Sequence, residues 1–164
     1  NATGMDEISA NLVKEFELEL LPFLVHIINR VIMSNIFPEN WKIAKVIPLF
    51  KNKGKKTDAK NYRPVSNLMT FSKILESILE TQLRKYFEDN KYIPDCQYGF
   101  RKARSTGLAL LEATTRWKEL RQQKKHIGIC FYDLSAAFDC LDKTILDEKL
   151  KIFGVQPGAR KLLK

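Results

Sequence analysis

Cysteine and histidine are scarce in this chain, which has 3 cysteines and 2 histidines among its 164 residues. Cys96, Cys130 and Cys140 form no Cys-x-x-Cys pair. A structural zinc site needs about four Cys or His ligands at short spacings, and a disulfide framework needs an even set of cysteines. The composition therefore argues against both kinds of site, and it favours a reducing, intracellular compartment.

Long apolar runs are lacking as well. No stretch approaches the roughly 20 apolar residues of a membrane-spanning helix, and the first residues lack the basic start and apolar stretch of a signal peptide. We therefore expect no membrane partner. The chain starts with Asn1 instead of Met, and residues 160–164 resemble the middle of a helix, so we expect it to be a piece of a longer protein.

Acidic residues are the minority, because 19 Asp and Glu stand against 28 Lys and Arg and give a net charge of +9. Residues 42–63 carry a net charge of +7 and residues 101–125 a net charge of +6, so the rest of the chain is net negative. Two basic segments on a mildly acidic background indicate a polyanionic partner, such as nucleic acid or nucleotide phosphates. A solvated, lysine-rich loop is the alternative. The hydrophobic content of 45% is enough for a core, and the length suits about one domain.

Periodic apolar residues predict a largely helical chain with a few strands. Helices are expected from about Ser9, from Pro22, from Thr70 as a cap, over 106–124, after Asp142 with Gly154 just past the end, and from Pro157. The apolar residues of the helix from Thr70 and of the helix over 106–124 are expected to be buried. Residues 42–50 and 61–67 are predicted to be extended, and the basic loop 51–60 between them could fold back as a hairpin. Both faces of residues 127–134 are apolar, so this run is predicted to be a central strand.

Asp133 lies near the end of this apolar run, and three interpretations of its carboxylate remain open. It can be a Mg²⁺ ligand for phosphoryl chemistry, since Mg²⁺ takes one or two carboxylates together with phosphate oxygens. It can be a phosphatase-like nucleophile, although such enzymes usually have a second Asp where this chain has Ser135. It can also cap a helix that begins at 135–137, and from the residues alone cap and ligand have comparable weight.

Two further groups of residues have the chemistry to bind phosphates. Lys51 and Arg63 flank the basic loop, and a guanidinium fork together with a compact ammonium suits a triphosphate. Residues 97–106 interleave aromatic and basic side chains, which can stack on bases and hold phosphates. For Phe100 itself, the preferred interpretation is burial in a structured loop.

The order and spacing of these motifs resemble the reverse transcriptases of non-LTR (LINE-like) retrotransposons. The most specific matches are Asn61-Tyr62-Arg63-Pro64, Gln97-Tyr98-Gly99-Phe100-Arg101 with Ser105-Thr106, and Asp133 with Ala137-Phe138-Asp139. The resemblance runs from about Gly4 to the end. It implies an α+β, right-hand polymerase fold, with fingers over 1–125 and the beginning of the palm over 126–164, truncated before the family's Asp-Asp hairpin.

The resemblance also implies roles for individual residues. Asp133 matches the first catalytic, metal-binding aspartate, with the Leu134 backbone carbonyl as a neighbouring ligand, and the complete enzyme would hold two Mg²⁺ (or Mn²⁺) ions. Phe138 matches the aromatic residue that rejects the ribose 2′-hydroxyl, so that dNTPs are chosen over rNTPs. The residues expected to grip the triphosphate are Lys51 and Arg63, and those expected in the template or nucleotide pocket are Gln97, Gly99, Phe100 and Arg101.

By the same resemblance, the reaction is two-metal nucleotidyl transfer with template RNA, primer DNA and dNTPs as partners, in the nucleus and cytoplasm. One departure is that no two aspartates are adjacent anywhere in the 164 residues, so we expect the chain alone to be inactive. A smaller departure is Met5-Asp6-Glu7, where relatives usually carry Asp-Gly. The alternative function is a non-catalytic, RNA- or DNA-binding remnant or domesticated module.

Overall fold

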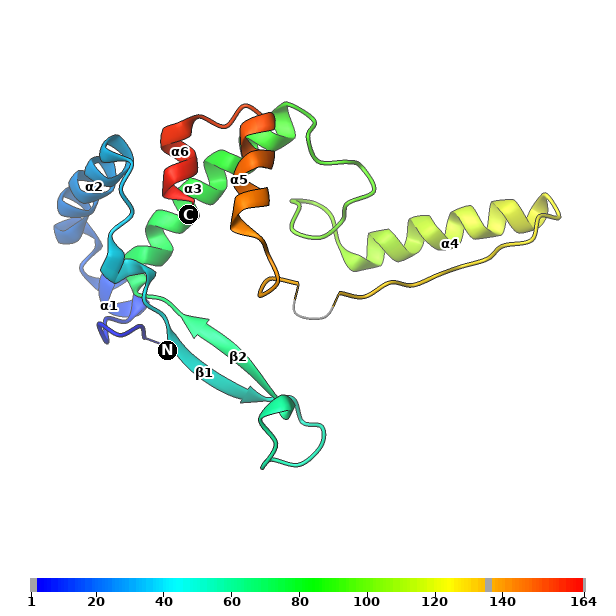
Figure 1. Ribbon diagram of the computed structural model, residues 1–164, viewed down its shortest axis with the longest axis horizontal. Helices are drawn as coiled ribbons and strands as arrows, with labels where there is room; N and C mark the ends of the chain where they lie inside the picture. Colours follow the sequence, from blue (N-terminus) through cyan, green and yellow to red (C-terminus); the bar gives the residue numbers. More distant parts are fainter. Residues whose placement is uncertain (1–2, 135–136, 164) are drawn as a thin grey trace. The chain divides into compact units, whose positions relative to one another are not determined.

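The computed structural model describes residues 3–134 and 137–163, which fall into two compact units. Unit 1 combines Asn1–Leu83 with Lys143–Lys164, and unit 2 is Arg84–Asp142. Figure 1 shows the helices of both units and the hairpin of unit 1. The sequence placed the boundary between fingers and palm at 125/126, which is not a boundary of either unit. The division into fingers and palm stays a prediction.

Unit 1 begins with two helices, α1 (Ala10–Glu15) and α2 (Glu17–Ser34). The Ser9 hydroxyl accepts a hydrogen bond from the Leu12 amide at 3.1 Å, which confirms the predicted cap. Pro22 was expected in the first turn of the second helix, but α2 begins five residues earlier and Pro22 lies inside it. The break falls instead at Phe16, whose backbone is not helical, and acidic residues in the first turn of α2 suit the positive end of a helix.

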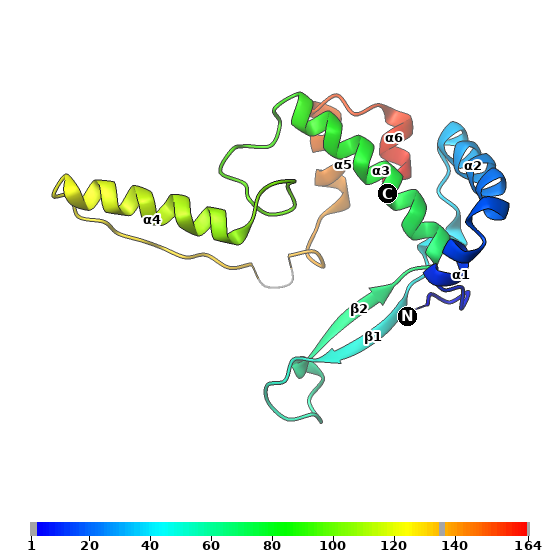
Figure 2. The same ribbon diagram turned by 180° about the vertical axis from the view of Figure 1, so that it is seen from behind.

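The core of unit 1 lies between α2, α3 (Thr70–Asp89) and α6 (Pro157–Leu162). Its buried residues are Ile28, Val31, Phe37, Leu75 and Leu162. Leu75 is fully buried, as the apolar pattern of this helix predicted. Figure 2 shows the same helices from behind, with α6 beside α3.

Hydrogen bonds fix the start of α3 against the rest of unit 1. The Thr70 hydroxyl donates to the Ile8 carbonyl at 2.7 Å, and the Ser72 hydroxyl donates to the carbonyl of Trp41 at 2.9 Å. Trp41 belongs to the 3₁₀ helix η1 (Glu39–Lys42). Thr70 was predicted to cap α3, but it is the first residue of that helix. Its hydroxyl instead joins the start of α3 to the segment before α1.

The hairpin of unit 1 pairs β1 (Lys45–Phe50) with β2 (Tyr62–Asn67), and its antiparallel register runs from Lys45↔Asn67 to Phe50↔Tyr62. This confirms the predicted fold-back of the basic loop. Pro48 stands opposite Pro64, which a two-stranded ribbon tolerates because both of its strands are edges. A short 3₁₀ helix, η2 (Ala59–Asn61), leads from the loop into β2.

The last part of unit 1 is α5 (Lys143–Ile152), followed by α6. Gly154 follows α5 with a φ of 80°, and Pro157 opens α6, as the sequence predicted for both residues. Among the helices of the described residues, none is both long and apolar enough to cross a lipid bilayer.

Unit 2 contains the end of α3, a loop over 90–105 and α4 (Thr106–Gln122). The Ser105 hydroxyl accepts a hydrogen bond from the Leu108 amide at 3.2 Å and caps α4. No residue of α4 is buried. The apolar residues of this helix were expected to pack inwards, so that expectation is wrong for the described residues.

The predicted strand over 127–134 is wrong for the structure, which has no strand in that segment. A central strand needs neighbours that pair its N–H and C=O groups. Of the residues that the structure describes, only β1 and β2 pair as strands, and they pair with each other. The segment is therefore unpaired, and Phe131 is 87% exposed. The mixture of helices with one sheet still fits the predicted α+β class.

Candidate functional site

Lys51 and Arg63 lie on the same face of the hairpin. The register pairs Leu49 with Arg63 and Phe50 with Tyr62, and the Lys51 amide continues the ladder by donating to the Asn61 carbonyl at 2.8 Å. Side chains alternate between the two faces of a strand, so Leu49, Lys51, Asn61 and Arg63 share one face. Lys51 and Arg63 are then diagonal neighbours, about 7–8 Å apart at the backbone.

Both cations of this pair have donors to spare. The Lys51 ammonium donates one hydrogen bond to the Lys60 carbonyl at 2.7 Å, which leaves two of its three donors. Arg63 is exposed, and no ion pair of Arg63 is found among the described residues. A guanidinium and an ammonium at this separation can share one chain of phosphate groups.

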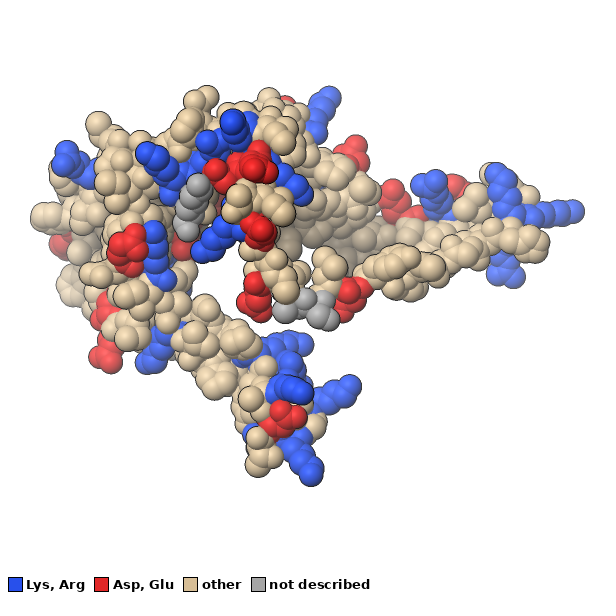
Figure 3. All heavy atoms as spheres, viewed as in Figure 1, with Lys and Arg blue, Asp and Glu red and all other residues tan. Residues whose placement is uncertain are grey.

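A basic surface surrounds the pair at the tip of the hairpin. We name residues 51–60 the lysine loop; all ten are exposed. The loop carries five lysines against one acid, Asp58, and Figure 3 shows blue atoms gathered at this tip. An uncompensated positive charge of this density attracts polyanions.

The predicted pocket residue Arg101 is bound within unit 2. Its guanidinium donates to both carboxylate oxygens of Glu88, at 3.0 and 2.7 Å, and to the Pro94 carbonyl at 3.0 Å. The Arg101 side chain is only 11% exposed and that of Glu88 33%. This bidentate pair holds the loop over 94–101 against the end of α3. A direct role of Arg101 in a nucleotide pocket stays a prediction, and the geometry supports a role in shaping the loop.

The ion pair makes the stability of unit 2 depend on pH. The hydrogen bonds from Arg101 lower the pKa of Glu88 from its ordinary value. A lowered pKa gives stability that is present above the unfolded pKa, about 4.3 for Glu, and is lost as the pH falls through the folded pKa. We expect the free energy of unfolding of the wild type to fall as the pH drops through this acidic window. At neutral pH the free energy of unfolding of Glu88→Gln should be lower than that of the wild type, and it should fall less over the same window.

Denaturant unfolding at a series of pH values checks this prediction. Glu112→Gln, on the exposed surface of α4, is the matched control and should behave as the wild type does. Equal pH dependence in the wild type and in Glu88→Gln would contradict a stabilising role of the pair.

Phe100 and Phe138 meet within unit 2. Their ring centroids are 6.2 Å apart and the rings are nearly perpendicular, at 86°. Phe100 has a positive φ of 60°, and its carbonyl accepts a hydrogen bond from the Arg84 guanidinium. Burial of Phe100 was preferred on sequence grounds, but the residue is 79% exposed. The Phe100 carbonyl is thus held by a hydrogen bond, while the ring stays exposed beside Phe138.

The other predicted residues of unit 2 are exposed. Gln97 and Gly99 lie in the loop before Phe100, and the side-chain amide of Gln97 donates to the Gly99 carbonyl at 3.5 Å. Asp133 is exposed, and Leu134 is 79% exposed. Two interpretations of Asp133 involved residue 135: it stands where a phosphatase-like enzyme has a second Asp, and it would begin the helix that Asp133 could cap. Residue 135 lies outside the described residues. Within the described part of the chain, no three His, Cys, Asp or Glu side chains are grouped as metal ligands.

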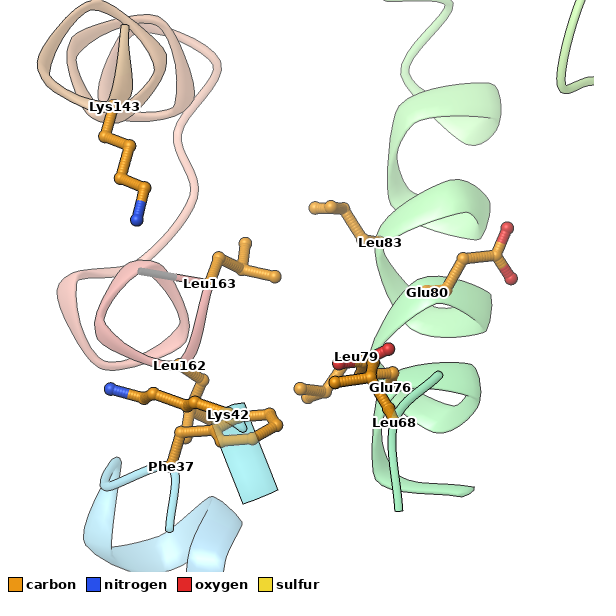
Figure 4. Close-up of a pocket in the computed structure, with 10 residues that line it drawn as sticks. All are labelled: Phe37, Lys42, Leu68, Glu76, Leu79, Glu80, Leu83, Lys143, Leu162 and Leu163. Atoms are coloured by element: carbon orange, nitrogen blue, oxygen red, sulfur yellow. The ribbon is translucent and has the colours of Figure 1, made fainter. Parts of the chain in front are cut away.

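Unit 1 contains a cavity with a volume of about 550 Å³. Figure 4 shows the residues that line it, which are Phe37, Lys42, Leu68, Glu76, Leu79, Glu80, Leu83, Lys143, Leu162 and Leu163. Burial raises the pKa of Glu76 at this cavity. None of the residues predicted to bind a nucleotide or a metal lines it, so the cavity is separate from the candidate site.

Sequence reasoning missed three residues that shape the candidate site. Glu88 is the partner of Arg101, and Asn61 and Tyr62 donate side-chain hydrogen bonds into the lysine loop. Asn61 and Tyr62 were part of a specific motif but received no role. No local signal identifies Glu88, because it is one of several acids on the polar side of a helix.

Comparison with known proteins gives a consistent result over most of the chain. A family model described as reverse transcriptase (RNA-dependent DNA polymerase) matches residues 51–163. The "RNA-directed DNA polymerase from mobile element jockey" of Drosophila melanogaster is 31% identical over 84% of this chain, and its namesake in Drosophila funebris is 29% identical over 84%. The "Probable RNA-directed DNA polymerase from transposon BS" of Drosophila melanogaster is 26% identical over 83%. The chain spans 15% of the length of each of these relatives.

Proposed function

The chain belongs to the reverse transcriptase family, and from this premise we propose that it supplies the nucleotide-binding part of an RNA-directed DNA polymerase of a non-LTR retrotransposon. In the complete polymerase the primer 3′-hydroxyl attacks the α-phosphate of a dNTP, and pyrophosphate leaves. Template RNA and primer DNA are the nucleic-acid partners. These 164 residues contain no adjacent pair of aspartates, so the proposal assigns to them only part of the catalytic residues.

The chain's own residues have distinct tasks in this reaction. Lys51 and Arg63 bind the triphosphate and neutralise its negative charge. Phe138 lies beneath the sugar and excludes a 2′-hydroxyl. Gln97, Gly99 and Phe100 present one edge of the pocket for the templating base, while Arg101 keeps their loop in shape.

Asp133 and the Leu134 carbonyl are the proposed metal ligands. Carboxylate and carbonyl oxygens are the donors that Mg²⁺ takes, together with phosphate oxygens and water. Both groups are in an exposed segment. Their oxygen atoms suit a divalent cation and would supply part of its coordination sphere. A cation held there would neutralise phosphate charge. Asp133 contributes the negative charge that holds it.

One observation carries the proposal, namely the position of Lys51 and Arg63 on one face of the hairpin. The pairing of β1 with β2, continued by the hydrogen bond from the Lys51 amide to the Asn61 carbonyl, brings together two cations from opposite ends of the hairpin loop. A flexible loop would not keep two such side chains at a spacing suited to one triphosphate. The arrangement therefore supports phosphate binding by this hairpin more directly than net charge does.

The test is an NMR titration of the 164-residue chain with dATP. We expect Lys51→Gln and Arg63→Gln each to raise the Kd by about 10- to 100-fold, because each removes a hydrogen bond to a charged group. Lys45→Gln is the matched control, since Lys45 lies on the same face of the same strand, about 20 Å away along β1. Its Kd should equal that of the wild type.

Equal Kd values in the wild type and in both variants would contradict the triphosphate site. A uniform loss in all three variants, including Lys45→Gln, would indicate non-specific attraction to a basic surface, and that result favours the alternative of a non-catalytic nucleic-acid-binding module.

A further inference from the structure

Asn61 fastens the lysine loop from one side. Its side-chain amide donates to the Lys55 carbonyl at 2.8 Å. Gly54 lies against the same amide with a φ of 80°, and a Cβ on Gly54 would be only 2.5 Å from the Asn61 nitrogen. The close approach requires glycine at position 54, for both its space and its backbone conformation.

Tyr62 fastens the same loop from the other face of the hairpin. Its hydroxyl donates to the Lys56 carbonyl at 2.9 Å, and its ring packs on Phe50 with centroids 5.4 Å apart. The Lys56 ammonium lies 5.8 Å from the centre of the Phe50 ring, within reach of a cation–π contact. Two consecutive carbonyls of the loop are therefore held by two consecutive residues, Asn61 at the end of η2 and Tyr62 at the start of β2.

These contacts lie outside the core. All residues of the lysine loop are exposed, so fastening the loop buries no apolar surface there. Five lysines on one loop repel each other and favour an open, extended conformation. The hydrogen bonds oppose that repulsion, and Lys51, which itself donates to the Lys60 carbonyl, is anchored to the fastened segment.

We propose that Asn61 and Tyr62 are positioning residues for triphosphate binding. They hold the lysine loop closed at the end of β1, which keeps the Lys51 ammonium on the face that carries Arg63. Neither residue touches the nucleotide; both lower the entropic cost of bringing two cations onto one triphosphate. This inference rests on the proposed function of Lys51 and Arg63.

The experiment combines two measurements on the 164-residue chain. Amide hydrogen exchange over 52–59 reports the order of the loop, and NMR titration with inorganic tripolyphosphate gives the Kd without a contribution from base or sugar. The variants are Asn61→Ala, and Tyr62→Phe, which keeps the ring and removes only the hydroxyl. Asn40→Ala is the matched control, because Asn40 is exposed in the same unit and outside the hairpin.

We expect exchange in the loop to accelerate in Asn61→Ala and Tyr62→Phe, and the Kd to rise about 3- to 10-fold in each, the ratio that corresponds to one lost hydrogen bond. The backbone signals of the core should not move. In the polymerase, the same variants should raise the KM for dNTP while kcat at saturating dNTP stays within about twofold, since ground-state and transition-state binding of the triphosphate are lost together.

Two results would overturn the inference while leaving the proposed function intact. Faster exchange with an unchanged Kd means that the shape of the loop does not govern binding, and unchanged exchange means that these residues do not fasten the loop. If Lys51→Gln and Arg63→Gln also leave the Kd unchanged, both the inference and the triphosphate site fail. The two failures are therefore distinguishable in one set of titrations.

Discussion

Replacing Asp133 with Asn is expected to abolish Mg²⁺-dependent primer extension by the complete polymerase, with a loss of about 10³-fold or more in rate. The substitution keeps the size of the side chain and removes the negative charge that a hard cation requires. A bound metal contributes several kcal/mol of charge stabilisation, and each 1.36 kcal/mol is a factor of ten in rate. RNA-templated extension of a labelled primer measures the effect.

Template binding separates this effect from misfolding. Asp133 is exposed, so Asn at this position should leave the fold and the affinity for template RNA largely unchanged. Glu112→Gln removes an exposed carboxylate from α4 of the same unit and should retain the wild-type rate. Wild-type extension by Asp133→Asn would refute its role as a metal ligand.

Replacing Phe138 with Val is expected to admit ribonucleotides. The ratio of kcat/KM for dCTP to kcat/KM for CTP should fall by about 10- to 200-fold. This is the range of discrimination that a steric difference of about one methylene group produces. The smaller side chain leaves room for a 2′-hydroxyl where the aromatic ring would clash. The Phe138 ring also packs edge-on against the Phe100 ring. Phe138→Val therefore removes this contact as well.

The control for this prediction is Phe23→Val, which shortens an exposed aromatic side chain in α2. It should leave sugar selectivity as in the wild type. If Phe138→Val incorporates dCTP normally and still rejects CTP, Phe138 is not the residue that reads the sugar.

Features with local causes were predictable from the sequence. Ser9 caps a helix because its hydroxyl reaches an amide three residues ahead. Pro157 starts a helix because a missing N–H costs nothing in the first turn. The hairpin followed from two extended segments around a basic loop. The two helix starts are decided within a few residues, and the hairpin by pairing between neighbouring segments of the chain.

Features that depend on distant partners were not predictable. The apolar run over 127–134 has the composition of a central strand, yet strand formation requires pairing partners, and the described residues supply none to it. The preference for burying Phe100 failed for the same reason, because composition says nothing about whether a ring has an apolar surface to cover it. A local pattern specifies a tendency, and tertiary contacts decide its outcome.

The candidate site shows the same division. Lys51, Arg63, Asp133 and Phe138 were identified through motifs, because residue type and spacing carry the chemistry. Arg101 belonged to a motif too, but its bidentate partner Glu88 lies 13 residues earlier on a helix with no distinguishing local pattern. The motif located the loop, and only the structure revealed that the arginine of this motif is bound to the protein itself.

The central claim is that the hairpin holds the triphosphate while Asp133 supports the chemical step. Single-turnover incorporation of one dNTP by the polymerase, measured as a function of dNTP concentration, separates these two tasks. Lys51→Gln should raise the apparent Kd for dNTP by about 10-fold or more and leave a measurable maximal rate, whereas Asp133→Asn should lose the maximal rate. An unchanged dNTP Kd in Lys51→Gln, together with an unchanged maximal rate in Asp133→Asn, would contradict the account.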